Sequence, residues 1–148
     1  MPSLHQLKTL PYSIQNLSSL VLDIESYPKF LPWCGAARVI SEVDSEILAE
    51  LVIEFKGFHG KYQSKVLHTA LPEGNYLIKV EAINGPFEYL KNTWLFTKKR
   101  EHTQIEFFID FSMKSGLLNK LIGSFYITAS EKIVDAFEKR ASVIYPVK

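Results

Sequence analysis

The feature that most constrains the fold is an alternation of apolar and polar residues between positions 35 and 113. Successive side chains of a β-strand point to opposite faces, so a period of two is typical of antiparallel strands with one exposed and one covered face. The covered positions of two such segments are Ile47, Ala49, Leu51 and Ile53, then Ile105, Phe107, Ile109, Phe111 and Met113. Short turns rich in Gly, Pro and Asn separate the segments. We expect six strands here and a seventh near residues 5–10.

Helical patterns flank these strands. Between 14 and 24, apolar residues recur three or four positions apart, behind Ser13, a residue type favoured at the helix N-cap. A longer helix is predicted over Leu117–Ala141, with Gly123 as a point of close approach or flexibility. Its first turns could form a mobile lid. Together the elements predict one α+β domain over residues 1–148, in which a sheet of six to seven strands packs against a long C-terminal helix.

The composition and the net charge argue against several classes of protein. The formal net charge is +1, which argues against a protein that binds nucleic acid through its phosphates, and we expect no DNA partner. The single cysteine, Cys34, excludes an internal disulfide and any CxxC motif. No apolar run approaches the ~18 residues that span a bilayer. The first eight residues lack the apolar core of a signal peptide, so we expect a cytoplasmic protein.

Motifs of the common enzyme classes are not found. The four histidines are isolated, and His59 and His68 are nine residues apart, which places them on opposite faces of one strand. Nothing in the sequence places a base beside Cys34, and there is no GxSxG, Walker or GxGxxG motif. We therefore expect a non-catalytic protein with no metal and no cofactor.

The covered faces of the strands carry much aromatic and aliphatic surface, and two interpretations stay open. These side chains pack entirely into a core, or the sheet curls around its helix and leaves an apolar pocket. Four polar residues share the covered side, namely Tyr62, His68, Tyr76 and Asn92. In the second interpretation they bind the polar head group of a largely apolar ligand.

Three sequence blocks resemble the coenzyme Q-binding, START-like family. Residues 27–34 read YPKFLPWC and resemble the family's YPxFLPWC, and residues 85–96 resemble its GPFxxLxxxWxF element. Residues 136–141, AFEKRA, resemble its closing AFxxRA helix. The blocks follow the family's order across nearly the whole chain. Ser112 and Met113 depart from it, because the family often has an acidic residue and a phenylalanine there, and this departure concerns the fine contacts to a ligand.

The resemblance implies a helix-grip fold, in which the sheet wraps around the C-terminal helix and two small helices follow the first strand. It also implies non-catalytic binding of a polyprenyl quinone, with ubiquinone as bound ligand, in support of respiration. Some bacterial members are described as ribosome-association toxins that hinder the joining of ribosomal subunits. The wider superfamily includes polyketide cyclases and aromatases. The absence of a transit peptide favours the bacterial branch.

The first hypothesis is a protein that binds a polyprenyl quinone or another apolar small molecule, with a peripheral contact to the inner membrane. The expected ligand-binding residues are Trp33, Phe55, Tyr62, His68, Tyr76, Asn92, Trp94, Phe107, Phe111, Leu118, Leu121, Ile122 and Phe125. One alternative is association with the large ribosomal subunit through a patch such as Lys98–Arg100. The other is a cyclase that uses His68 and the tyrosines as acid–base groups.

Overall fold

A computed structural model describes residues 3–55, 57–123 and 126–145 of the chain. Within them, seven strands form one antiparallel sheet in the order β1-β7-β6-β5-β4-β3-β2. The strands are β1 (Ser3–Leu10), β2 (Cys34–Val43), β3 (Glu46–Phe55), β4 (Phe58–Ala70), β5 (Tyr76–Ala82), β6 (Phe87–Lys99) and β7 (His102–Met113). The helices are α1 (Ile14–Leu22), α2 (Gly116–Gly123) and α3 (Tyr126–Ile144), with short 3-10 helices η1 (Ile24–Lys29) and η2 (Pro72–Gly74). This architecture confirms the predicted α+β helix-grip fold.

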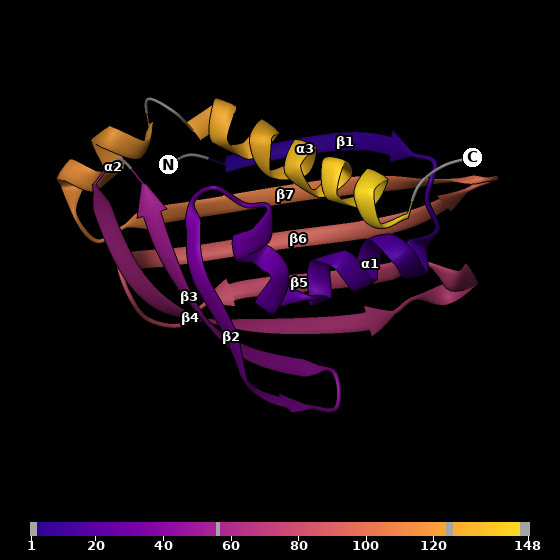
Figure 1. Ribbon diagram of the computed structural model, residues 1–148, viewed down its shortest axis with the longest axis horizontal. Coiled ribbons are helices and arrows are strands. Elements are labelled where there is room, and N and C mark those ends of the chain that lie inside the picture. The colour runs from indigo at the N-terminus through magenta and orange to yellow at the C-terminus, as the bar shows by residue number, and fades with distance from the viewer. Residues whose placement is uncertain (1–2, 56, 124–125, 146–148) are drawn as a thin grey trace.

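The apolar and polar residues that alternate in the sequence are alternately buried and exposed in the sheet. On β3, Ile47, Ala49 and Leu51 are buried on the concave face, whereas Glu46, Leu48 and Glu50 point the other way. The helices pack against the concave face. Figure 1 shows α3 lying lengthwise along the sheet with α1 beside it. Large side chains from the middle of the sheet, including Ile78 and Phe96, form the centre of the core.

The two small helices expected after the first strand are α1 and η1. The Ser13 hydroxyl accepts a hydrogen bond from the Asn16 backbone N–H at 3.0 Å and so caps α1, as the sequence predicts. The tyrosine hydroxyl of Tyr27 in η1 donates to the carbonyl of Val21. This bond ties the two helices together at the corner that leads into β2.

The YPKFLPWC segment forms this corner, and its aromatic rings pack on α3. The rings of Tyr27 and Phe30 meet Phe137 edge to face at centroid distances of 5.5 Å and 5.1 Å. The Arg140 guanidinium lies 5.5 Å from the centre of the Phe30 ring. Aromatic pairs of this geometry stabilise a contact beyond the area they bury. The segment therefore fixes the corner against the C-terminal helix.

The helical region predicted over Leu117–Ala141 is described as two helices, α2 and α3, on either side of residues 124–125. The α2 helix is tied to the end of β7: the Asn119 amide accepts from the Met113 N–H at 2.8 Å and donates to the Met113 carbonyl at 3.0 Å. None of the helices in the described ranges has the length and apolar character needed to cross a membrane.

Candidate ligand-binding cavity

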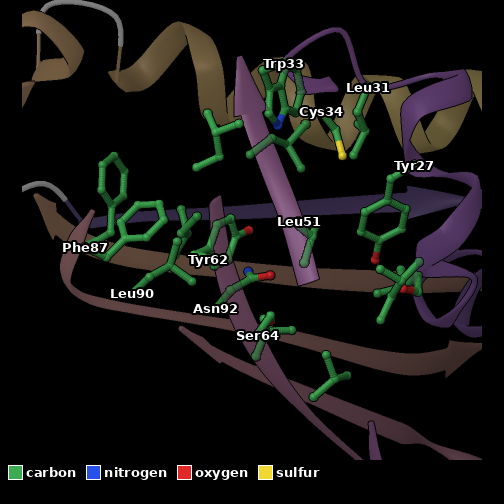
Figure 2. A pocket seen from close by; sticks show the side chains of 18 of the residues that line it. Tyr27, Leu31, Trp33, Cys34, Leu51, Tyr62, Ser64, Phe87, Leu90 and Asn92 are labelled. Atoms are coloured by element: carbon green, nitrogen blue, oxygen red, sulfur yellow. The ribbon is translucent and has the colours of Figure 1, made fainter. Parts of the chain in front are cut away.

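A cavity of about 250 Å³ lies between the concave face of the sheet and the helices that cover it (Figure 2). Side chains from α1, η1, the corner segment, strands β2 to β7 and α3 enclose it. Its lining residues are Val21, Ile24, Tyr27, Leu31, Trp33, Cys34, Leu51, Val52, Ile53, Phe58, Tyr62, Ser64, Val66, Val80, Phe87, Leu90, Asn92, Trp94, Phe107, Ile109, Phe111, Met113, Ile133 and Phe137. An apolar pocket and a packed core thus coexist on the same face of the sheet.

The lining is apolar and uncharged. None of the residues that line the cavity in the described part of the chain carries a formal charge at neutral pH. Apart from the two indole N–H groups, the polar side-chain groups are those of Tyr27, Cys34, Tyr62, Ser64 and Asn92. A cavity lined in this way is suited to an apolar molecule with a small, neutral polar part.

The titratable groups of the lining are held in their protonated forms. Burial raises the pKa of the Cys34 thiol to about 11, and its Sγ donates to the Ala36 carbonyl at 3.5 Å. Burial also raises the pKa of the Tyr27 and Tyr62 hydroxyls above the ordinary range. In a weakly polar cavity the charged form of each group loses hydration, which disfavours ionisation. At neutral pH these groups therefore act as hydrogen-bond donors and not as bases.

One end of the cavity lies beneath α2. Phe87, Leu90 and Met113 line the cavity there, and Leu118 of α2 packs against these three side chains. The α2 helix therefore covers this end of the cavity, which is the position expected for a lid. The mobility of this lid stays a prediction.

The structure brings six of the thirteen expected binding residues together around the cavity. They are Trp33, Tyr62, Asn92, Trp94, Phe107 and Phe111. Leu118 lies behind the lining, as described above. The side chains of Phe55, Leu121 and Ile122, and the whole of Phe125, lie outside the described residues.

His68 and Tyr76 share the concave face with these residues but do not line the cavity. They contact each other, with His68 Nδ1 and the Tyr76 hydroxyl 2.6 Å apart and the rings stacked. A strand rises ~3.3 Å per residue, so His68 lies about 20 Å along β4 from Tyr62. Shared parity gives two residues the same face, but it does not give them the same position along the strand. The structure thus separates this pair from the other polar residues.

Several lining residues were missed by the sequence analysis, and some of them had a readable signal. Ser64 lies between Tyr62 and Val66 at the covered parity of β4, and Leu51 is a covered residue of β3. Parity placed Leu51 on the covered face and would have placed Ser64 there, but neither was predicted to line a cavity. Tyr27 and Cys34 belong to the corner segment, where no periodicity indicates the direction of a side chain.

Comparisons with known proteins agree with this architecture. Residues 10–138 match the family described as polyketide cyclase / dehydrase and lipid transport. The chain is 52% identical to the ribosome association toxin RatA of Rickettsia prowazekii, over 97% of this chain and 99% of that protein. It is 28% identical to the mitochondrial coenzyme Q-binding protein COQ10 homolog B of Xenopus laevis, over 93% of this chain and 57% of that protein.

A solved structure shares the fold at low sequence identity. The ZhuI aromatase/cyclase from Streptomyces sp. R1128 superposes with a TM-score of 0.81 at 12% identity, over 95% of this chain and 93% of that one. The resemblance first seen in three short blocks thus extends over almost the whole chain. The protein belongs to the polyketide cyclase/dehydrase and lipid transport family.

Proposed function

We propose that the protein binds a polyprenyl quinone such as ubiquinone, or a lipid of similar chemistry, in the cavity and does not transform it. The observation that carries the proposal is the cavity itself, with its apolar, uncharged lining and few neutral polar groups. Each methylene that a ligand buries there contributes roughly 0.8 kcal/mol to binding. The relative named a coenzyme Q-binding protein supports the same ligand class.

The size of the cavity bears on how such a ligand binds. About 250 Å³ is slightly below the ~300–1,000 Å³ typical of small-molecule pockets. This space suits a substituted ring and a short part of its tail, so the rest of a polyprenyl chain extends beyond the cavity. A membrane surface is the natural place for that exposed tail, and we include a peripheral membrane contact in the proposal.

The titratable groups of the cavity support binding without catalysis. A cyclase needs a group that accepts a proton from its substrate near neutral pH. Burial raises the pKa of Tyr27, Cys34 and Tyr62, so near neutral pH each stays protonated and its proton-accepting anionic form is not populated. His68, which the cyclase alternative used together with the tyrosines, does not line the cavity and contacts Tyr76 instead.

Tryptophan fluorescence offers a direct test, because both tryptophans of the chain, Trp33 and Trp94, line the cavity. Titration with a short-chain ubiquinone is expected to quench their emission to saturation. Phe107→Asp, at a side chain 1% exposed in the cavity wall, is expected to abolish saturable quenching. The matched control is Phe108→Asp, because this neighbour is 39% exposed and points to the opposite face of the strand.

Circular dichroism identifies variants that keep the fold. If Phe107→Asp does not fold, Leu51→Asp places the same charge on β3, in another wall of the cavity. A folded variant of either kind that still binds quinone as the wild type does would contradict the proposal.

A second candidate function is ribosome association, and we propose it on the 52% identity to a protein named for that activity. The chain offers exposed basic residues at the end of β6 and in the turn to β7, namely Lys98, Lys99 and Arg100. Co-sedimentation with purified large ribosomal subunits tests the idea. Replacing all three residues by alanine is expected to abolish co-sedimentation, and Lys91→Ala in β6 is the control. Equal pelleting of both variants would exclude this turn as the contact.

A further inference from the structure

The cavity has a small polar area in an otherwise apolar wall, formed by Tyr62, Ser64 and Asn92. Tyr62 and Ser64 are two residues apart on β4, so both face the cavity. Asn92 comes from β6, and β5 lies between the two strands. Figure 2 shows the three side chains grouped in the central part of the cavity, with apolar side chains such as Phe87 and Leu90 to one side.

The orientation of the Asn92 amide follows from its neighbours. The Trp94 indole Nε1 can only donate, so the Asn92 atom 2.9 Å from it is the acceptor Oδ1. Asn92 Nδ2 then donates to the Phe108 carbonyl at 2.8 Å. One further N–H of this amide remains, and the two bonds hold it in a fixed direction. Asn92 thus contributes an oriented donor.

The two hydroxyl groups have no such partners. Among the residues that the structure describes, no group makes a hydrogen bond with the hydroxyl of Tyr62 or of Ser64, although Ser64 is only 2% exposed. Neither oxygen is among the enclosed polar atoms that lack a partner, so both open onto the cavity, where a ligand oxygen can accept a hydrogen bond from them. Both hydroxyls are therefore available to donate to a ligand.

We propose that Tyr62, Ser64 and Asn92 select the ligand by donating hydrogen bonds to an uncharged oxygen acceptor, the carbonyl group of a quinone ring. This inference rests on the proposed function and adds the chemistry that the site recognises. A carboxylate or phosphate would need a cation, and none lines the cavity among the described residues. A plain hydrocarbon would leave all three donors unpaired. The site therefore favours a neutral carbonyl compound over fatty acids and over hydrocarbons.

The test compares three probes with alkyl tails of nine or ten carbons, namely decylubiquinone, decylbenzene and decanoic acid, by isothermal titration calorimetry. The wild-type protein is expected to bind decylubiquinone most tightly. Tyr62→Phe keeps the ring, which meets Phe87 edge to face at 5.1 Å, and removes only the hydroxyl. This variant and Ser64→Ala are each expected to weaken quinone binding about 3- to 10-fold, the usual range for one hydrogen bond, and to leave decylbenzene binding unchanged.

Tyr89→Phe is the matched control, because this half-buried tyrosine does not line the cavity and its hydroxyl bonds to Asp110 at 3.3 Å. Its quinone affinity is expected to equal that of the wild type. Quinone binding that stays within twofold of wild type in both cavity variants would overturn the inference alone. An equal loss of decylbenzene binding, or tighter binding of decanoic acid than of quinone, would overturn it too. A wild-type protein that binds no quinone would instead contradict the proposed function.

Discussion

Enlarging one side chain that faces the cavity tests whether this space is empty in solution. Leu51 is 8% exposed and lines the cavity, whereas Ala49, two residues earlier on β3, is 0% exposed and lies in packed core. Leu51→Phe and Ala49→Leu enlarge their side chains by the same number of carbon atoms. The two variants therefore differ mainly in whether there is space for the added atoms.

The expected change in the free energy of unfolding follows from the volume of the cavity. At ~24 cal/mol per Å³, an empty and closed cavity of 250 Å³ costs roughly 6 kcal/mol of stability, an upper value because the cavity is partly open. At about 0.8 kcal/mol per added carbon, Leu51→Phe should raise the free energy of unfolding by about 2 kcal/mol. In packed core, the same enlargement costs about 1–3 kcal/mol. Leu51→Phe should therefore raise Tm by about 4–8 °C and Ala49→Leu should lower it, at about 2–4 °C per kcal/mol.

Thermal unfolding followed by circular dichroism measures both shifts, and calorimetry with decylubiquinone measures what the filled cavity still binds. Leu51→Phe is expected to be more stable than the wild type and to bind quinone more weakly. Stability and function are then opposed at this position, as expected for a cavity kept open for a ligand. A fall in Tm for Leu51→Phe as large as that for Ala49→Leu would refute the reasoning, because it would mean that the protein has no space there.

Two further predictions concern Gly85 and Cys34. Gly85 has a φ of +90°, and a Cβ there would lie 2.5 Å from the Tyr62 Cβ. Gly85→Ala should therefore lower the free energy of unfolding by more than the ~1–2 kcal/mol that a left-handed backbone costs by itself. It should also weaken quinone binding, because the added Cβ displaces Tyr62. Gly74→Ala has a similar φ of +81° and open space around it, so equal effects of the two variants in chemical unfolding would exclude a clash with Tyr62. Because burial raises the Cys34 pKa from 9.0 to about 11, its alkylation by iodoacetamide at pH 8 should be about 100-fold slower than that of a free thiol and should accelerate up to about pH 11. Alkylation at the rate of a free thiol at pH 8 would contradict this assignment.

Strand parity explains why much of the fold could be predicted from the sequence. Buried positions such as Ile47, Ala49 and Leu51 recur at every second residue of β3, and this period is enough to define the face of a strand. Turn residues then set the order of the strands along the chain. The apolar pattern over 117–141 continues past Gly123 and so predicts one helix, whereas the structure describes α2 and α3 on either side of residues 124–125. The bonds from Asn119 to Met113, which tie α2 to the adjacent end of β7, have no counterpart in the apolar pattern.

The cavity was harder to predict than the sheet. Parity correctly placed Tyr62, Asn92 and Trp94 on the concave face, but it also placed His68 there, although His68 lies beyond the cavity beside Tyr76. Hydrogen-bond partners also could not be predicted from the sequence. Asn92 is occupied by two neighbours, whereas the hydroxyls of Tyr62 and Ser64 are not, and this difference depends on the twist and pairing of three strands.

The central claim is that the cavity carries a quinone, and the most direct test is to identify what the protein already holds. Native mass spectrometry, followed by organic extraction, can be applied to protein purified from a quinone-producing host. The account predicts a co-purifying polyprenyl quinone, and less of it in Leu51→Phe than in the wild type. A protein that is empty after purification and does not bind added quinone would contradict the account and favour ribosome association as the function.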